Sequence, residues 1–235
     1  MMESEEDITQ GIIGFGKSTI SLIPGIGQVL AGWDAYKKSQ FDRAVKKAIE
    51  TLQALNEQVQ GLEDIFQDQW WQSDEGKQFA RKVWDAAIDQ QFEDKQELFI
   101  NALVQGGKKK DVAHLEKLKF IDILRSLSRA AIMVLADMHE MFKIQVRGQG
   151  RSPESTSGYP LVDPNAIASK LSDRYDPYLV TAAIHEMESQ GLFSDIGEWH
   201  KDTSGRSRPG GGFNNALCYT DFASRFVEFI TIQAD

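Results

Sequence analysis

The sequence of 235 residues has very little cysteine and no excess of basic charge. Its one cysteine, Cys218, excludes an internal disulfide framework and is typical of a reducing compartment. Acidic residues outnumber basic ones by 35 to 26, the net charge is −9, and no basic tail is present. This balance argues against nonspecific nucleic-acid binding as the main task, because neutralising phosphates needs clustered Lys and Arg.

The sequence also lacks the basic start of a secretory signal, since acidic residues precede its first apolar run. We therefore expect a protein that is either free in the cytoplasm or peripheral to the inner membrane.

Catalytic and metal-binding patterns are missing as well. His139-Glu140 and His185-Glu186 each lack the second histidine, four residues after the first, that a helical zinc motif needs. His139 lies on or beside an apolar helix face, so we expect a buried core residue there. Cys218 has no histidine near it in sequence to activate it, and the carboxylates are spread along helix surfaces. We therefore predict no enzymatic activity, no metal site and no cofactor.

The most apolar segment spans residues 11–33, and Gly11, Gly16, Lys17 and Ser18 match the phosphate-binding pattern G-x-x-x-x-G-K-[ST]. A phosphate-binding loop of this kind follows a buried strand and opens a helix. Here the preceding residues are MMESEEDITQ, which are polar and acidic, and a Pro-Gly pair cuts the following helix short. We therefore predict that the segment binds no nucleotide.

The same segment is instead predicted to form an apolar helical hairpin over residues 1–36, with its turn at Pro24, Gly25 and Gly27. Each arm is shorter than the roughly 20 apolar residues that span a bilayer. The hairpin would therefore lie in the membrane interface, re-enter it, insert after a switch, or pack against protein. The residues expected to contact the membrane or a second copy are Ile12, Ile13, Phe15, Ile20, Leu22, Ile23, Ile26, Val29, Leu30 and Trp33.

A helical bundle is expected over residues 37–145. It opens with a long helix whose apolar residues repeat at spacings of three and four, as in a heptad seam. This helix either packs inside the bundle or forms an intermolecular coiled coil, so self-association is expected through the hairpin or this helix. The seam residues are Phe41, Val45, Ala48, Leu52, Leu55, Val59, Leu62 and Phe66.

Further helices follow. Ser73 is expected to cap one of them, and Gly106-Gly107 to break the chain ahead of a solvated loop at 108–110. Two more helices are predicted over 111–127 and 128–143. The apolar stripe expected on the first consists of Val112, Leu115, Leu118, Ile121 and Leu124.

Residues 146–164 are rich in Gly, Ser and Pro, which predicts a linker or a long surface loop. Over 165–235 the expected order is helix, helix, strand, long loop, strand, helix, as in a small winged-helix-like α+β domain. Its second helix would open at Asp176-Pro177 and close at Gly191. The whole chain is thus predicted to be mainly α.

A DNA-reading domain of this type needs a basic second helix, whereas this helix carries Glu186 and Glu188 and no Lys or Arg. We therefore expect a protein partner at this domain rather than nucleic acid. The basic residues that could contact nucleic acid or another partner are Lys170, Arg174, Lys201, Arg206 and Arg208.

Three parts of the sequence together resemble bacterial abortive-infection proteins of the Abi-alpha type. They are residues 23–27 (IPGIG), the bundle leading into 120–128 (FIDILRSLS), and the ending 191–193 (GLF) with 219–226 (YTDFASRF). The resemblance implies a role in bacterial antiphage defence and supplies no catalytic residues.

Three functions remain open at this stage. The first is a non-enzymatic defence protein that acts on a membrane, or by self-assembly, through its hairpin. The second is a soluble scaffold whose hairpin is core or oligomer interface. The third is a winged-helix regulator that binds DNA, and it requires the basic residues of the domain to outweigh Glu186 and Glu188.

Overall fold

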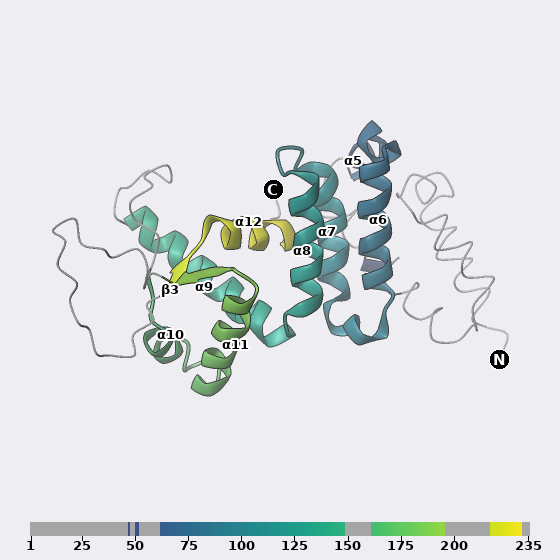
Figure 1. Cartoon of the computed structure of the whole chain (residues 1–235). Helices are drawn as coiled ribbons and strands as arrows, with labels where there is room; N and C mark the ends of the chain where they lie inside the picture. The colour runs from purple at the N-terminus through teal and green to yellow at the C-terminus, as the bar shows by residue number, and fades with distance from the viewer. Residues whose placement is uncertain (1–46, 48–49, 52–61, 149–160, 196–216, 232–235) are drawn as a thin grey trace, which may run out of the picture. The chain divides into compact units, whose positions relative to one another are not determined.

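The protein is mainly helical, as predicted, in a computed structural model of the chain (Figure 1). The residues that the structure describes are 47, 50–51, 62–148, 161–195 and 217–231. These described residues fall into two compact units, divided between residues 126 and 127 and between residues 228 and 229, with both ends of the described chain in the first unit. The boundaries expected at 145 and 165 both lie inside the second unit. The predicted hairpin and most of the heptad seam lie outside the described residues.

The first unit is a set of packed helices in which α6 contacts both α7 and α8 (Figure 1). Ser73 caps α6, since its side chain accepts a hydrogen bond of 3.1 Å from the amide of Gly76. This confirms the cap that the sequence predicts. The helices of this unit are α5 (Leu62–Gln67), η1 (Gln69–Gln72), α6 (Asp74–Ala87), η2 (Gln90–Lys95), α7 (Gln96–Lys108) and α8 (His114–Ser126).

The predicted chain break at Gly106-Gly107 is wrong, because both glycines are buried inside α7. A Cβ on Gly106 would lie 2.3 Å from the ring of Phe79 on α6, and one on Gly107 would lie 2.7 Å from Ile65. Both positions are therefore glycine because neighbouring side chains come too close for any larger residue. Close packing of helices decides these positions, and it outweighs the low intrinsic helix propensity of glycine.

The apolar stripe predicted for α8 is also partly wrong. Ile121 and Leu124 are buried as expected, but Leu115 is 77% exposed. The buried face of α8 instead includes Lys117 and Phe120. The prediction counted apolar residues alone and therefore left out a buried lysine. As a result, the predicted stripe follows a different face of the helix at its start.

The described part of the second unit combines four helices with a small antiparallel sheet. Helix α9 packs on α11, α10 also packs on α11, and the sheet has the order β1-β3-β2. Its elements are α9 (Arg129–Gly148), β1 (Leu161–Val162), α10 (Pro164–Lys170), α11 (Pro177–Ser189), β2 (Phe193–Asp195), β3 (Leu217–Tyr219) and α12 (Asp221–Ile230), whose last two residues belong to the first unit.

Both predicted ends of α11 are confirmed. The carboxylate of Asp176 accepts hydrogen bonds from the amides of Tyr178 and Leu179, and Gly191 has a φ of 74° just after the helix. Strand β3 then pairs with β2, with Phe193 opposite Tyr219.

The predicted linker at 146–164 has regular structure at both ends. Residues 146–148 continue α9, residues 161–162 form β1 against β3, and Pro164 starts α10. Residues 149–160 lie outside the described residues. A strand of two residues, such as β1, carries too little periodicity to be recognised in the sequence.

Candidate functional site

The predicted contact residues of the hairpin, from Ile12 to Trp33, lie outside the described residues, as do Lys201, Arg206 and Arg208 of the wing. Lys170 is exposed near the end of α10. Arg174 forms an ion pair of 2.6 Å with Asp137 on α9, and Asp137 also accepts a hydrogen bond of 2.8 Å from the hydroxyl of Tyr175. Arg174 is therefore paired with a carboxylate inside the second unit.

The exposed face of α11 is apolar at its start. Tyr178 is 87% exposed and Leu179 is 39% exposed. Further along the helix, the carboxylate of Glu186 accepts hydrogen bonds from both the amide and the hydroxyl of Ser128, just before α9. Glu186 therefore helps to hold α11 against the start of α9, a role that the sequence does not reveal.

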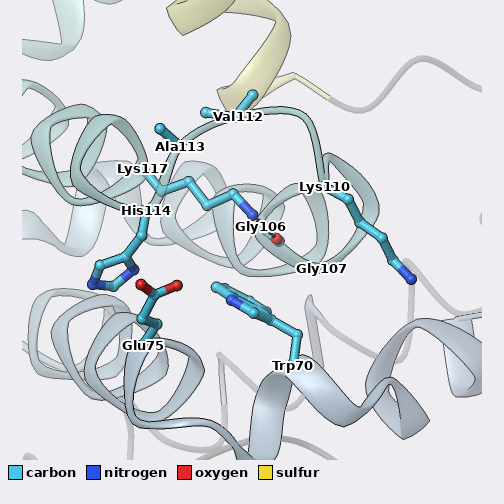
Figure 2. A pocket seen from close by; sticks show the side chains of 9 residues that line it. All are labelled: Trp70, Glu75, Gly106, Gly107, Lys110, Val112, Ala113, His114 and Lys117. Carbon is cyan, nitrogen blue, oxygen red and sulfur yellow. Dashed lines mark hydrogen bonds between the residues drawn. The ribbon is translucent and has the colours of Figure 1, made fainter.

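A cavity of about 280 Å³ opens in the first unit beside the junction of η1, α7 and α8 (Figure 2). Trp70, Glu75, Lys110, His114 and Lys117 line it together with the two glycines of α7 and residues 112–113. Figure 2 shows the indole of Trp70 below the end of the Lys117 side chain. No prediction from the sequence pointed to this site.

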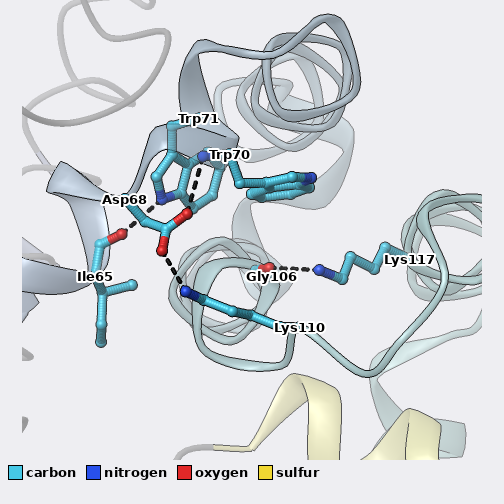
Figure 3. Close-up of polar contacts among 7 residues, drawn as sticks. All are labelled: Ile65, Asp68, Trp70, Trp71, Gly106, Lys110 and Lys117. Carbon is cyan, nitrogen blue, oxygen red and sulfur yellow. Dashed lines mark hydrogen bonds and ion pairs between the residues drawn. The ribbon is translucent and has the colours of Figure 1, made fainter.

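Asp68 and Lys110 fix one edge of this cavity (Figure 3). Asp68 caps η1 by accepting a hydrogen bond of 2.9 Å from the amide of Trp70, and it forms an ion pair with Lys110. The hydrogen bond from Lys110, followed by the one from the Trp70 amide, lowers the pKa of the Asp68 carboxyl. The indole N–H of Trp71 donates a hydrogen bond of 2.8 Å to the carbonyl of Ile65, and this bond holds the Trp71 ring in place beside Trp70.

Lys117 is the least exposed charged group of the cavity, with 4% of its surface accessible. Its Nζ donates a hydrogen bond of 2.7 Å to the carbonyl of Gly106 and lies 4.2 Å from the ring centroid of Trp70 (Figure 3). Burial lowers the pKa of this amine, and the negative charges of Asp111, Glu75 and Asp68 oppose the shift. Buried titratable groups with a shifted pKa beside a cavity mark a candidate functional site.

His114 forms the opposite side of the cavity. Its Nε2 lies 3.1 Å from the amide oxygen of Gln78, whereas its buried Nδ1 has no hydrogen-bond partner among the described residues. One signal in the sequence could have drawn attention to the site, which is the lysine at position 117 among the apolar residues of α8.

His139 is buried on α9, as predicted, and its Nδ1 lies 2.8 Å from the hydroxyl of Tyr219 on β3. Burial lowers the pKa of His139, with a further contribution from Lys143, and burial also raises the pKa of Tyr219. This pair is enclosed by the core of the second unit, so it is structural rather than a ligand site.

Within the described residues, no group of three or more His, Cys, Asp or Glu side chains is placed to hold a metal ion. In that same part of the chain, every helix is too short or too polar to cross a bilayer. No protein-family model matches the chain, and searches of curated proteins and of solved structures found no significant match.

Proposed function

We propose that this chain is a non-enzymatic interaction protein of the bacterial antiphage-defence type. In this proposal the hairpin at 1–36 attaches to a membrane or to a second copy, and a winged-helix-like module in the second unit contacts protein. The exposed apolar start of α11 is the observation that supports it most. The resemblance to proteins of the Abi-alpha type supports the defence role.

The module is proposed from the order α10, α11, β2, β3, α12, in which α11 takes the place of the helix that enters the major groove in helix-turn-helix proteins. Residues 177–189 include no Lys or Arg, and Tyr178 and Leu179 are exposed at the start of the helix. Tyrosine is enriched at protein interfaces, whereas DNA recognition needs basic and amide side chains at base edges and phosphates. A protein partner therefore fits this face better than DNA does.

A filter-binding assay with duplex DNA at low salt tests this part of the proposal on the full chain. We expect no salt-dependent retention, because the net charge is −9 and Arg174 is paired with Asp137. DNA retention that falls with salt, and falls again in Lys170→Ala, would overturn the assignment to protein and favour the DNA-binding regulator.

Attachment through the hairpin is tested by floating the full chain with lipid vesicles and by measuring its mass in solution by light scattering. We expect vesicle binding or self-association that Ile26→Glu abolishes. The matched control Gln28→Glu adds the same charge at a polar position of the segment and should leave attachment intact. A chain that stays monomeric and free of vesicles contradicts this part of the proposal.

The defence role has its own readout, which is phage plating on bacteria that express the chain. Ile26→Glu should restore plaque numbers to those of cells without the protein, and Gln28→Glu should not. Equal plaque numbers with and without the full chain, over a panel of phages, would contradict the defence role.

A further inference from the structure

Two lysines of the first unit are buried to the same extent, and they differ in what surrounds their ammonium groups. Lys95 and Lys117 are each 4% exposed. The Nζ of Lys95 donates to the carbonyls of Leu124 and Arg125 at 2.7 and 3.0 Å, at the end of α8. Such bonds satisfy carbonyls that the last turn of a helix leaves without partners. Lys95 is therefore explained as a structural cap.

Lys117 caps the end of α7 in the same way but with one carbonyl, that of Gly106. An ammonium group has three N–H donors, and the second neighbour of Nζ is the face of Trp70, which attracts a cation without accepting a conventional hydrogen bond. Within the described residues, Nζ thus has a single hydrogen-bond acceptor and lines the cavity (Figure 2). A buried charge with donors left over is costly unless a further acceptor reaches it.

The start of α8 is a further feature of the cavity that suits an anion. Helix α8 begins at His114, which lines the cavity together with the preceding residue, Ala113, and Ala113 has no side-chain oxygen to cap the helix. The exposed carboxylate of Glu75 also lines the cavity and repels further negative charge, which favours a ligand with one negative group over a polyanion.

We propose that this cavity binds a small organic carboxylate, with the Lys117 ammonium as its anchor and the Trp70 indole as its apolar wall. The volume of about 280 Å³ lies at the lower end of ligand pockets, so the ligand is of the size of a single ring with its carboxylate. A charge-assisted hydrogen bond to the buried Nζ of Lys117 supplies the affinity. This inference does not rest on the proposed function.

Calorimetric titration of the full chain with benzoate at low ionic strength tests this inference. We expect saturable binding at one site, and binding at least about tenfold weaker for benzyl alcohol, which keeps the ring and lacks the charge. Lys117→Met should weaken benzoate binding by about tenfold or more. Lys77→Met removes an exposed lysine of α6 outside the cavity and should bind as the natural chain does.

Because Lys117 also caps α7, a second variant leaves the lysine in place. Ala113 is exposed and lines the cavity, so Ala113→Phe should fill the space and abolish benzoate binding while the far-UV circular dichroism stays unchanged. Three results would overturn the proposal: no benzoate binding by the natural chain, undiminished binding by Ala113→Phe, or binding of inorganic phosphate in place of benzoate.

Discussion

At the scale of single residues, His139 shows how burial changes a titrating group. Its imidazole is 3% exposed and lies 2.8 Å from the Tyr219 hydroxyl, and Lys143, Glu140 and Glu228 are the charged groups that act on it. Because the pKa of His139 is lowered in the folded state, the unfolded chain binds the proton more readily. The contribution of His139 to the free energy of unfolding is therefore fully present above a pH of about 6.5. It decreases as the pH drops below that value toward the folded-state pKa.

The measurement is an NMR titration of the His139 imidazole, together with urea unfolding between pH 7 and pH 5. We expect a pKa below the ordinary value of 6.5, and a free energy of unfolding of the second unit that falls by at most about 1.4 kcal/mol per pH unit. His139→Gln should remove most of the pH dependence in this window. A titration of His139 at or above its ordinary pKa contradicts the prediction.

The burial of Lys117, by contrast, could not be predicted from the residues next to it in the sequence. The sequence correctly predicted His139 as a core residue because an imidazole beside an apolar stripe is commonly buried, and the prediction needed no knowledge of its partner. Lys117 is buried because two distant features meet it, the end of α7 and the ring of Trp70. Neither contact follows from the local pattern of α8, so the candidate cavity could not be derived from the sequence.

At the scale of elements, caps were predictable and helix contacts were not. Ser73 and Asp176 cap their helices through hydrogen bonds to amides two or three residues away, so a local pattern suffices. The glycines of α7 depend instead on the rings that lie against them from other elements. Glycine pairs commonly end helices, and this local rule failed at Gly106 because tertiary packing sets the requirement there.

Gly106→Ala tests that packing requirement. Alanine raises helix propensity by about 1 kcal/mol, but its Cβ would lie 2.3 Å from the buried ring of Phe79. We expect a net loss of about 1–3 kcal/mol in the free energy of unfolding, measured by urea denaturation. The second variant Phe79→Leu should reduce the cost of Gly106→Ala when the two are combined, and additive effects would show that the glycine and the ring are not coupled.

At the scale of the whole molecule, composition and hydrophobic periodicity predicted the mainly helical class. A helix of several turns, such as α6, repeats its apolar pattern often enough that single misplaced residues do not hide it. The strand order β1-β3-β2 was harder, since each strand has only two or three residues. The pair β2 and β3 was predictable from apolar runs on either side of a polar loop. Strand β1 was not, because it lies in a segment rich in Gly, Ser and Pro.

The net charge of −9 makes a further prediction about the proposed membrane attachment. A chain with this net charge is repelled by anionic lipid, and burial of apolar side chains such as Ile23 and Ile26 would supply the binding free energy. We therefore expect the full chain to float with vesicles of neutral phosphatidylcholine at least as well as with vesicles containing phosphatidylserine. Added salt should raise the fraction bound to the anionic vesicles, since it screens the repulsion between like charges. Binding that requires phosphatidylserine and is lost at high salt would contradict an apolar mode of attachment. It would then identify the basic residues of the wing, such as Arg206 and Arg208, as the next positions to substitute.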